Sequence, residues 1–181
     1  NGPFASSLPP TKSNLVTKAA MLLAESAGKQ PDVCINLTKN LPVSSGIGGG
    51  SIDAAATLLV LCKHWNYSPP KELLFQIAEK LGADVPACLF GRANFVSGIG
   101  NELTPSPILP ECWLVLVNPG IPLSTRQIFS RHFGIFSRPA PFNRPLNNLS
   151  ELVELLADRS NDLTKSAIIE APVISYILNA L

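Results

Sequence analysis

A cluster of glycines places the strongest constraint on what this chain can fold into and bind. Four glycines occupy five consecutive positions, from Gly46 to Gly50, directly before a helix predicted from Ser51 to about Trp65. A tight turn needs only one or two glycines. Because glycine has no Cβ, a glycine-rich backbone can approach a ligand closely and direct successive N–H groups at it. The start of a helix attracts anions in the same way. The segment therefore predicts a cradle for phosphate groups.

The spacing of these glycines excludes two common phosphate-binding motifs. No Gly-Lys-Ser/Thr follows, so the segment is not a P-loop, and the last glycine of the dinucleotide fingerprint GxGxxG is missing. Ser51 either caps the helix or offers its hydroxyl to a phosphate or a metal ion. A flexible loop before a helix is the simpler alternative. The small residues Ala54 to Ala56 favour the cradle, because they let the helix lie close beneath its loop.

Composition restricts the class of protein further. Of 181 residues, 46% are hydrophobic and 15% are charged, which is the opposite of a disordered chain. Fourteen basic and 13 acidic side chains leave a net charge of +1 with no basic stripe, so nucleic acid is not an expected partner. The longest mostly apolar run, Ala54 to Cys62, is too short to span a membrane. The four cysteines form no CxxC pair and are expected to be reduced and buried, in a cytoplasmic protein without a metal site.

The order of predicted elements indicates an α+β or α/β protein. A boundary between two domains is expected in the run of Pro105, Pro107 and Pro110, which gives domains 1–110 and 111–181. Helices are predicted for 15–27, 51–65, 71–81, 125–133, 149–157 and 166–181. Strands are predicted for 33–37, 93–96, 102–103 and 113–117. Trp65 and Trp113 are expected in the core.

Several stretches of the chain, taken in order, resemble the GHMP kinases. The central motif of that family, Pro-x-x-x-Gly-Leu-Gly-(small)-Ser-Ser-Ala-Ala, is similar to Pro42 to Ala56 here. The Gly-Gly-Gly-Ser-x-Asp-Ala-Ala form resembles one branch, whose members phosphorylate a cytidine-diphosphate-linked methylerythritol. The other matching stretches are Gly2-Pro3-Phe4, Asn14-Leu15-Val16, Leu81 to Pro86, Gly98-Ile99-Gly100, Val117 to Gly120, Ser124-Thr125 and Asn161-Asp162-Leu163.

The resemblance implies a fold and a reaction. The fold is the α+β GHMP kinase fold, in which a ribosomal protein S5 domain 2-like amino-terminal domain precedes a ferredoxin-like carboxy-terminal domain. The reaction transfers the γ-phosphoryl group of ATP, with Mg²⁺, to a hydroxyl of the methylerythritol substrate on the non-mevalonate route to isoprenoid precursors. The expected partners are these two small molecules, and the protein is a monomer or a homodimer. A kinase for another alcohol, such as mevalonate or homoserine, and a non-catalytic nucleotide-binding module remain alternatives.

The resemblance also assigns roles to individual residues. Asp84 matches the catalytic aspartate that accepts the proton of the attacking hydroxyl, although the residue alone, between Gly82 and Val85-Pro86, favours a helix cap. Ile99, Thr125 and Phe129 match substrate contacts, and Asn14 borders the nucleotide in related enzymes. The residues that correspond to ATP contacts are Lys39, Pro42, Val43, Ser44, Ser45, Gly46, Ile47, Gly48, Gly49, Gly50, Ser51 and Ile52.

The chain departs from the family pattern at three points. Ile52 replaces the second serine of the Ser-Ser pair, which removes a hydroxyl that could bind metal or phosphate. The amino-terminal motif, with a Lys that partners the catalytic Asp and a Gly-Tyr-His segment, is not found, and neither is the carboxy-terminal glycine loop. Both domains are therefore expected to be incomplete, and the 181-residue piece is expected to be inactive when isolated.

Overall fold

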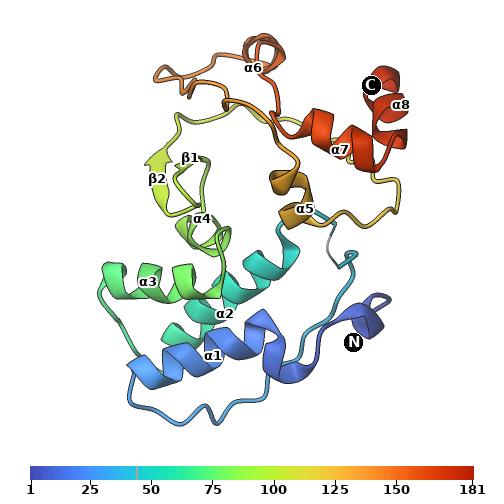
Figure 1. The fold of residues 1–181 in the computed structure, drawn as a ribbon. Coiled ribbons are helices and arrows are strands. Elements are labelled where there is room, and N and C mark those ends of the chain that lie inside the picture. Colours follow the sequence, from blue (N-terminus) through green and yellow to red (C-terminus); the bar gives the residue numbers. More distant parts are fainter. Residues whose placement is uncertain (44) are drawn as a thin grey trace. The chain divides into compact units, whose positions relative to one another are not determined.

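A computed structural model describes residues 1–43 and 45–181 of the chain and divides into two compact units. Unit 1 is Asn1–Pro105 and unit 2 is Ser106–Leu181. The division lies at the start of the proline-rich run that the sequence predicts as a linker. Figure 1 labels the helices and strands of each unit.

Unit 1 is a group of packed helices followed by a β-hairpin (Figure 1). Helix α1 packs against α2 and α3, and α4 packs against the same two helices. The core consists of small and branched apolar side chains, with Ala19, Leu23, Ala54, Leu58 and Val85 fully buried. The small side chains on α2 let it lie close to α1. The elements are α1 (Leu15–Ser26), α2 (Gly49–His64), α3 (Lys71–Leu81), α4 (Val85–Phe90), β1 (Asn94–Ser97) and β2 (Glu102–Pro105), after two short 3₁₀ turns, Ala5–Ser7 and Thr11–Ser13.

Local sequence signals determine most helix ends in unit 1. The Asn14 side chain caps α1 by accepting a hydrogen bond from the Val16 N–H at 3.0 Å, and Gly28, with φ of +62°, follows the end of that helix. Pro70 precedes α3, whose predicted bounds are confirmed. Helix α2 starts two residues earlier than predicted, because Gly48 in the left-handed conformation is its N-cap. The short helix α4 was not predicted.

The strand predictions in unit 1 are confirmed for the hairpin and wrong for residues 33–37. Strands β1 and β2 pair antiparallel, with Phe95 opposite Thr104. Residues 33–37 form no strand. A strand needs a continuous ladder of partners, and the described chain offers only isolated bonds beside this segment, such as Asn1 N to Leu37 O at 3.0 Å and Lys39 N to Asn1 O at 2.7 Å.

Unit 2 contains four helices over its described residues: α5 (Thr125–Ser130), α6 (Leu149–Ala157), α7 (Thr164–Glu170) and α8 (Val173–Ala180). Ser124 and Asn148 cap α5 and α6 through their side-chain oxygens. The single helix predicted over 166–181 is wrong: Pro172 separates α7 from α8, since proline cannot donate the backbone hydrogen bond that a helix interior requires. Helix α5 ends at Ser130, before the predicted Phe133.

The buried strand predicted for 113–117 does not form. Trp113 is fully exposed, and the side chains of its neighbours Leu114 and Val115 are mostly exposed as well. Since the described residues of unit 2 include no strand, this apolar segment has no ladder to join there. The prediction that Trp113 belongs to a core is therefore wrong, whereas Trp65 is partly buried against the core of unit 1.

The cysteines are free, as predicted, but they are less buried than predicted. Cys34 and Cys112 are exposed, because both lie in extended segments outside the helices. Cys62 and Cys88 are partly buried in unit 1, and this burial raises the pKa of each thiol. No helix in the described part of the chain combines the length and apolar character that a membrane span needs.

Candidate functional site

The glycine-rich loop reaches α2 through two residues in the left-handed conformation. Gly46 has φ of +78° and Gly48 has φ of +71°, values that residues with a Cβ rarely adopt. The carbonyl of Gly48 accepts the first helical hydrogen bond, from the Ile52 N–H at 2.9 Å. The N–H groups of Gly49, Gly50 and Ser51 precede that bond and have no acceptor within the helix. The loop therefore ends in a set of backbone donors that have no partner within the helix, at the positive end of 16-residue α2.

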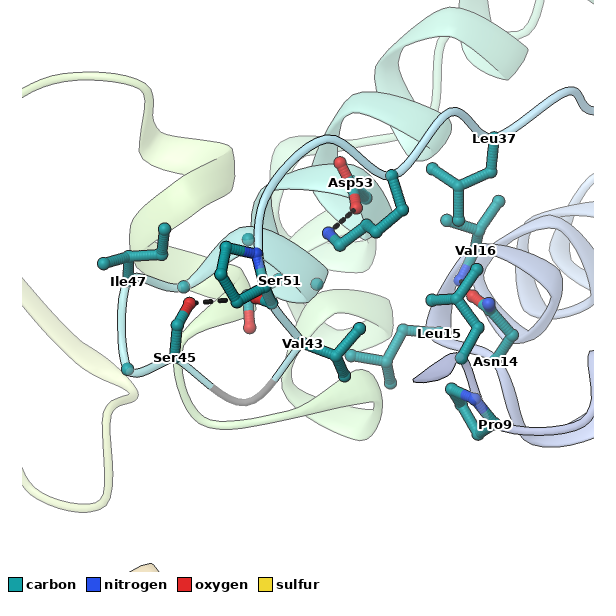
Figure 2. Close-up of a pocket in the computed structure, with 17 residues that line it drawn as sticks. Pro9, Asn14, Leu15, Val16, Leu37, Val43, Ser45, Ile47, Ser51 and Asp53 are labelled. Carbon is teal, nitrogen blue, oxygen red and sulfur yellow. Dashed lines mark hydrogen bonds and ion pairs between the residues drawn. The ribbon is translucent and has the colours of Figure 1, made fainter. Parts of the chain in front are cut away.

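These donors lie on a cavity of about 340 Å³ within unit 1, shown in Figure 2. Ten of the predicted nucleotide contacts line it: Lys39, Pro42, Val43, Ser45, Gly46, Ile47, Gly48, Gly49, Gly50 and Ser51. Ile52 does not line it and points away, with 54% of its surface exposed. Ser44 lies outside the described residues. The loop is held partly by itself, because the Ser45 hydroxyl donates to the Pro42 carbonyl at 2.9 Å (Figure 2).

A partly buried ion pair lies beside the first turn of α2. The Lys39 ammonium donates to Asp53 Oδ2 at 2.7 Å, and the two side chains are 9% and 29% exposed (Figure 2). A Cβ placed on Gly49 would lie 3.2 Å from Lys39 Nζ, so the ammonium is next to the free N–H groups of the helix start. The Lys39 ammonium therefore lies beside the end of α2 that attracts anions, with its own charge compensated by Asp53.

The role of Asp53 was not predicted. Its ion pair with Lys39 joins a loop to a helix across 14 positions, and no local sequence spacing indicates such a pair. The available signal was a single acidic residue next to an alanine run that the sequence predicts to be buried.

The opposite wall of the cavity is largely apolar. It is formed by the segment before α1 and by the first turn of that helix, with Leu8, Pro9, Leu15, Val16 and Leu37 among the lining residues. Asn14 also lines the cavity, and its Oδ1 accepts from the Val16 N–H in the helix cap. A cavity with donors and a cation on one side and apolar groups on the other suits a ligand that has an anionic part and an apolar, ring-like part.

Asp84 immediately precedes α4, yet its side chain does not cap that helix. Its carboxylate makes no capping hydrogen bond and the residue is exposed, whereas the following Val85 is fully buried. Asp84 therefore occupies a capping position without performing the capping function that the sequence left open.

The residues matched to substrate contacts are divided between the units. Ile99 lies in the turn between β1 and β2 and is 84% exposed. It borders a smaller cavity of about 130 Å³, together with Ala83, Pro86 and Gly100. Thr125 and Phe129 lie on α5 in unit 2, and both are exposed.

A metal-binding cluster is not found among the described residues, since no three His, Cys, Asp or Glu side chains gather there. Magnesium in proteins is commonly held by one or two carboxylates together with the phosphates of a substrate. In this cavity Asp53 and the Ser51 hydroxyl are the side chains of suitable chemistry, and Asp53 already binds Lys39.

Comparisons with known proteins identify the same segment. Residues 14–92 match the family model described as "GHMP kinases N terminal domain". The chain is 48% identical over 180 residues to 4-diphosphocytidyl-2-C-methyl-D-erythritol kinase of Paramagnetospirillum magneticum, an alignment that covers 99% of this chain and 63% of that protein. It is 44% identical to the kinase of the same name from Rhodospirillum rubrum, covering 99% of this chain and 59% of that one.

A solved structure resembles the chain as well. The crystal structure of a 4-(cytidine 5'-diphospho)-2C-methyl-D-erythritol kinase superposes with a TM-score of 0.66 at 28% identity, over 94% of this chain and 62% of that one. The chain thus spans about 60% of the length of the relatives that it matches.

Proposed function

We propose that the protein of this chain, which matches the GHMP kinases N terminal domain over residues 14–92, transfers the γ-phosphoryl group of ATP to a hydroxyl of 4-diphosphocytidyl-2-C-methyl-D-erythritol. This reaction would place it on the methylerythritol phosphate route to isoprenoid precursors. The partners in this proposal are two small molecules, and neither nucleic acid nor a membrane takes part. The protein is a monomer or a homodimer in the cytoplasm, a location that fits its free cysteines.

The observation that carries the proposal is the loop and helix start that line the larger cavity. The N–H groups of Gly49, Gly50 and Ser51, which have no acceptor within the helix, are suited to the oxygens of a triphosphate, and the Lys39 ammonium beside them offers further donors. Phosphoryl transfer depends on positioning and on stabilising charge at the transferred oxygens, with little covalent work by the protein. The apolar wall around Leu15 and Val16 would receive the nucleoside. Mg²⁺, bound mainly through the phosphates, would offset their charge.

Asp84 is proposed as the general base. A carboxylate that is free of capping hydrogen bonds can accept the proton of the attacking hydroxyl when the acceptor lies within hydrogen-bond distance. Ile99, Thr125 and Phe129 are proposed to contact the acceptor, with Phe129 packing near its cytosine ring.

The substitution Asp84→Asn tests the catalytic part of the proposal in the complete protein. Asn is nearly the same size and cannot take the proton, so we expect turnover to fall on the order of 10²–10⁴-fold. The affinity for ATP and the melting temperature should change little, because the glycine loop is untouched and the Asp84 side chain makes no capping bond.

Asp32→Asn is the matched control, since Asp32 is exposed and lies outside both cavities. It should leave all three quantities unchanged. An Asp84→Asn protein that folds, binds ATP and turns over within a few-fold of the unaltered protein would refute Asp84 as the base. ATP binding by the unaltered protein without any transfer would favour the non-catalytic nucleotide-binding module instead.

A further inference from the structure

The backbone of the turn between β1 and β2 lies close against Ala83, the residue before Asp84. Gly100 in this turn has φ of +104°. A Cβ on Gly100 would overlap the carbonyl oxygen of Ala83 and would lie 3.0 Å from both the carbonyl carbon and the Cβ of Ala83. Only a residue without a side chain therefore allows the turn to come this close to the main chain at Ala83.

Among the described residues the Asp84 side chain has no hydrogen-bond or ion-pair partner, so its position depends on the backbone around it. Its carboxylate makes no capping hydrogen bond. The backbone is held from within by the Val85 N–H, which donates to the Gly82 carbonyl at 3.1 Å, and by the buried side chains of Val85 and Pro86. Gly100 contacts the same short segment from the hairpin. The segment is thus held between the core on one side and the hairpin turn on the other.

We propose that Gly100 is a positioning residue for Asp84. Its contact with Ala83 fixes the backbone that carries the Asp84 carboxylate and keeps Ile99 beside the same segment, at the cavity that Ala83, Pro86 and Ile99 line. This inference rests on the proposed role of Asp84 as the base. The placement of a catalytic group within a fraction of an ångström affects rate strongly, and an error of about 1 Å can cost around 100-fold.

The same turn offers a matched control at Gly98. Gly98 also has a positive φ, of +63°, so alanine there strains the turn backbone, although less than at Gly100, whose φ of +104° lies outside the left-handed region. A Cβ added at Gly98 would meet side-chain atoms instead of the main chain. Asn101 Oδ1 would lie at 2.7 Å, and two carbon atoms of the Glu102 side chain at 3.4 and 3.5 Å. These side chains can move, so Gly98→Ala strains the turn without pushing on Ala83.

The experiment compares Gly100→Ala and Gly98→Ala in the complete protein, with kcat, KM for the acceptor, ATP affinity and melting temperature measured for each. We expect both variants to lose thermal stability, Gly100→Ala more than Gly98→Ala, and both to bind ATP normally. Gly100→Ala should lower kcat about 10–100-fold, and Gly98→Ala should stay within about threefold of the unaltered protein. In an Asp84→Asn background, Gly100→Ala should cause no further loss, because the group that it positions is already absent.

Equal kcat losses in the two variants, an unchanged kcat in Gly100→Ala, or a full additional loss in the Asp84→Asn background would each overturn the inference. If Gly100→Ala does not fold, Ala83→Gly replaces it, since it loosens the backbone next to Asp84 without any overlap with the turn. A kcat that falls several-fold at unchanged ATP affinity supports the inference, and an unchanged kcat contradicts it. A full-rate Asp84→Asn protein would instead show that the proposed base is wrong.

Discussion

The pairing of Lys39 with Asp53 shows how single residues stabilise the candidate site. Each charge is largely removed from water and is compensated by the other at 2.7 Å. Lys39→Met leaves the Asp53 carboxylate partly buried and unpaired, so we expect a loss of about 1–3 kcal/mol in the free energy of unfolding. The loss should lie near the lower end of this range, because Asp53 is partly exposed. Urea unfolding of the single variants and the double variant Lys39→Met/Asp53→Asn measures their coupling. Strictly additive losses would mean that the pair contributes nothing.

Glu151 gives a residue-level prediction about pH in unit 2. Hydrogen bonds from the Asn147 side chain and from Arg144, with a further bond from the Asn147 N–H, lower its pKa from 4.5 to about 2. A lowered pKa in the folded state means that this stabilisation is complete above pH 4.5 and disappears as the pH falls to about 2. An NMR titration of the Glu151 carboxyl group should give this low value, and Asn147→Ala should raise it. A Glu151 pKa near 4.5 in the unaltered protein would contradict the hydrogen bonds.

At the scale of elements, what could be predicted from the sequence was the local part of the fold. The bounds of α1 and α3 follow from residues whose own chemistry starts or ends a helix, namely Asn14, Gly28 and Pro70. The glycine run likewise locates the loop and the cavity wall. The strands predicted for residues 33–37 and 113–117 do not form. A strand requires a distant partner strand, which its own sequence does not specify. Asp53 was missed for the same reason, since its partner lies in another element.

The start of α2 allows the two roles of its glycines, conformation and close approach, to be separated. Gly50 lies in the helix, and a Cβ there would make ordinary contact with Leu15 at 3.7 Å. Gly50→Ala should therefore stabilise the fold by up to about 1 kcal/mol, because alanine favours a helix. If the phosphates of ATP lie on this turn, the added methyl group should nevertheless weaken ATP binding. Calorimetric titration with ATP, beside thermal unfolding, measures both effects.

Gly48→Ala is the matched comparison for this prediction. Gly48 has φ of +71° with open space around it, so alanine there strains the backbone by about 1–2 kcal/mol without a clash. Stability and ATP affinity should thus both fall in Gly48→Ala, whereas only affinity falls in Gly50→Ala. Unchanged affinity in a folded Gly50→Ala protein would show that the helix start does not contact the nucleotide.

For the whole molecule, the reactivity of the four cysteines measures how exposed the chain is in each unit. Cys34 in unit 1 and Cys112 in unit 2 are exposed, whereas partial burial raises the pKa of the Cys62 and Cys88 thiols. Since the thiolate is the reactive form, an alkylating reagent near pH 7.5 should label Cys34 and Cys112 first. Peptide mass spectrometry over time measures the order, with the unfolded protein as a control in which all four react. Early labelling of Cys62 or Cys88 would contradict the packing of unit 1.

We propose that the complete protein is a kinase whose acceptor is 4-diphosphocytidyl-2-C-methyl-D-erythritol. Its most direct test follows the γ-phosphate of labelled ATP in the complete protein, with this acceptor, mevalonate and homoserine offered separately. We predict that label appears in the cytidine-diphosphate-linked acceptor with matching formation of ADP, and that it does not appear in the other two alcohols. Transfer to mevalonate or homoserine in preference, or binding of ATP with no transfer to any acceptor, would contradict the claim.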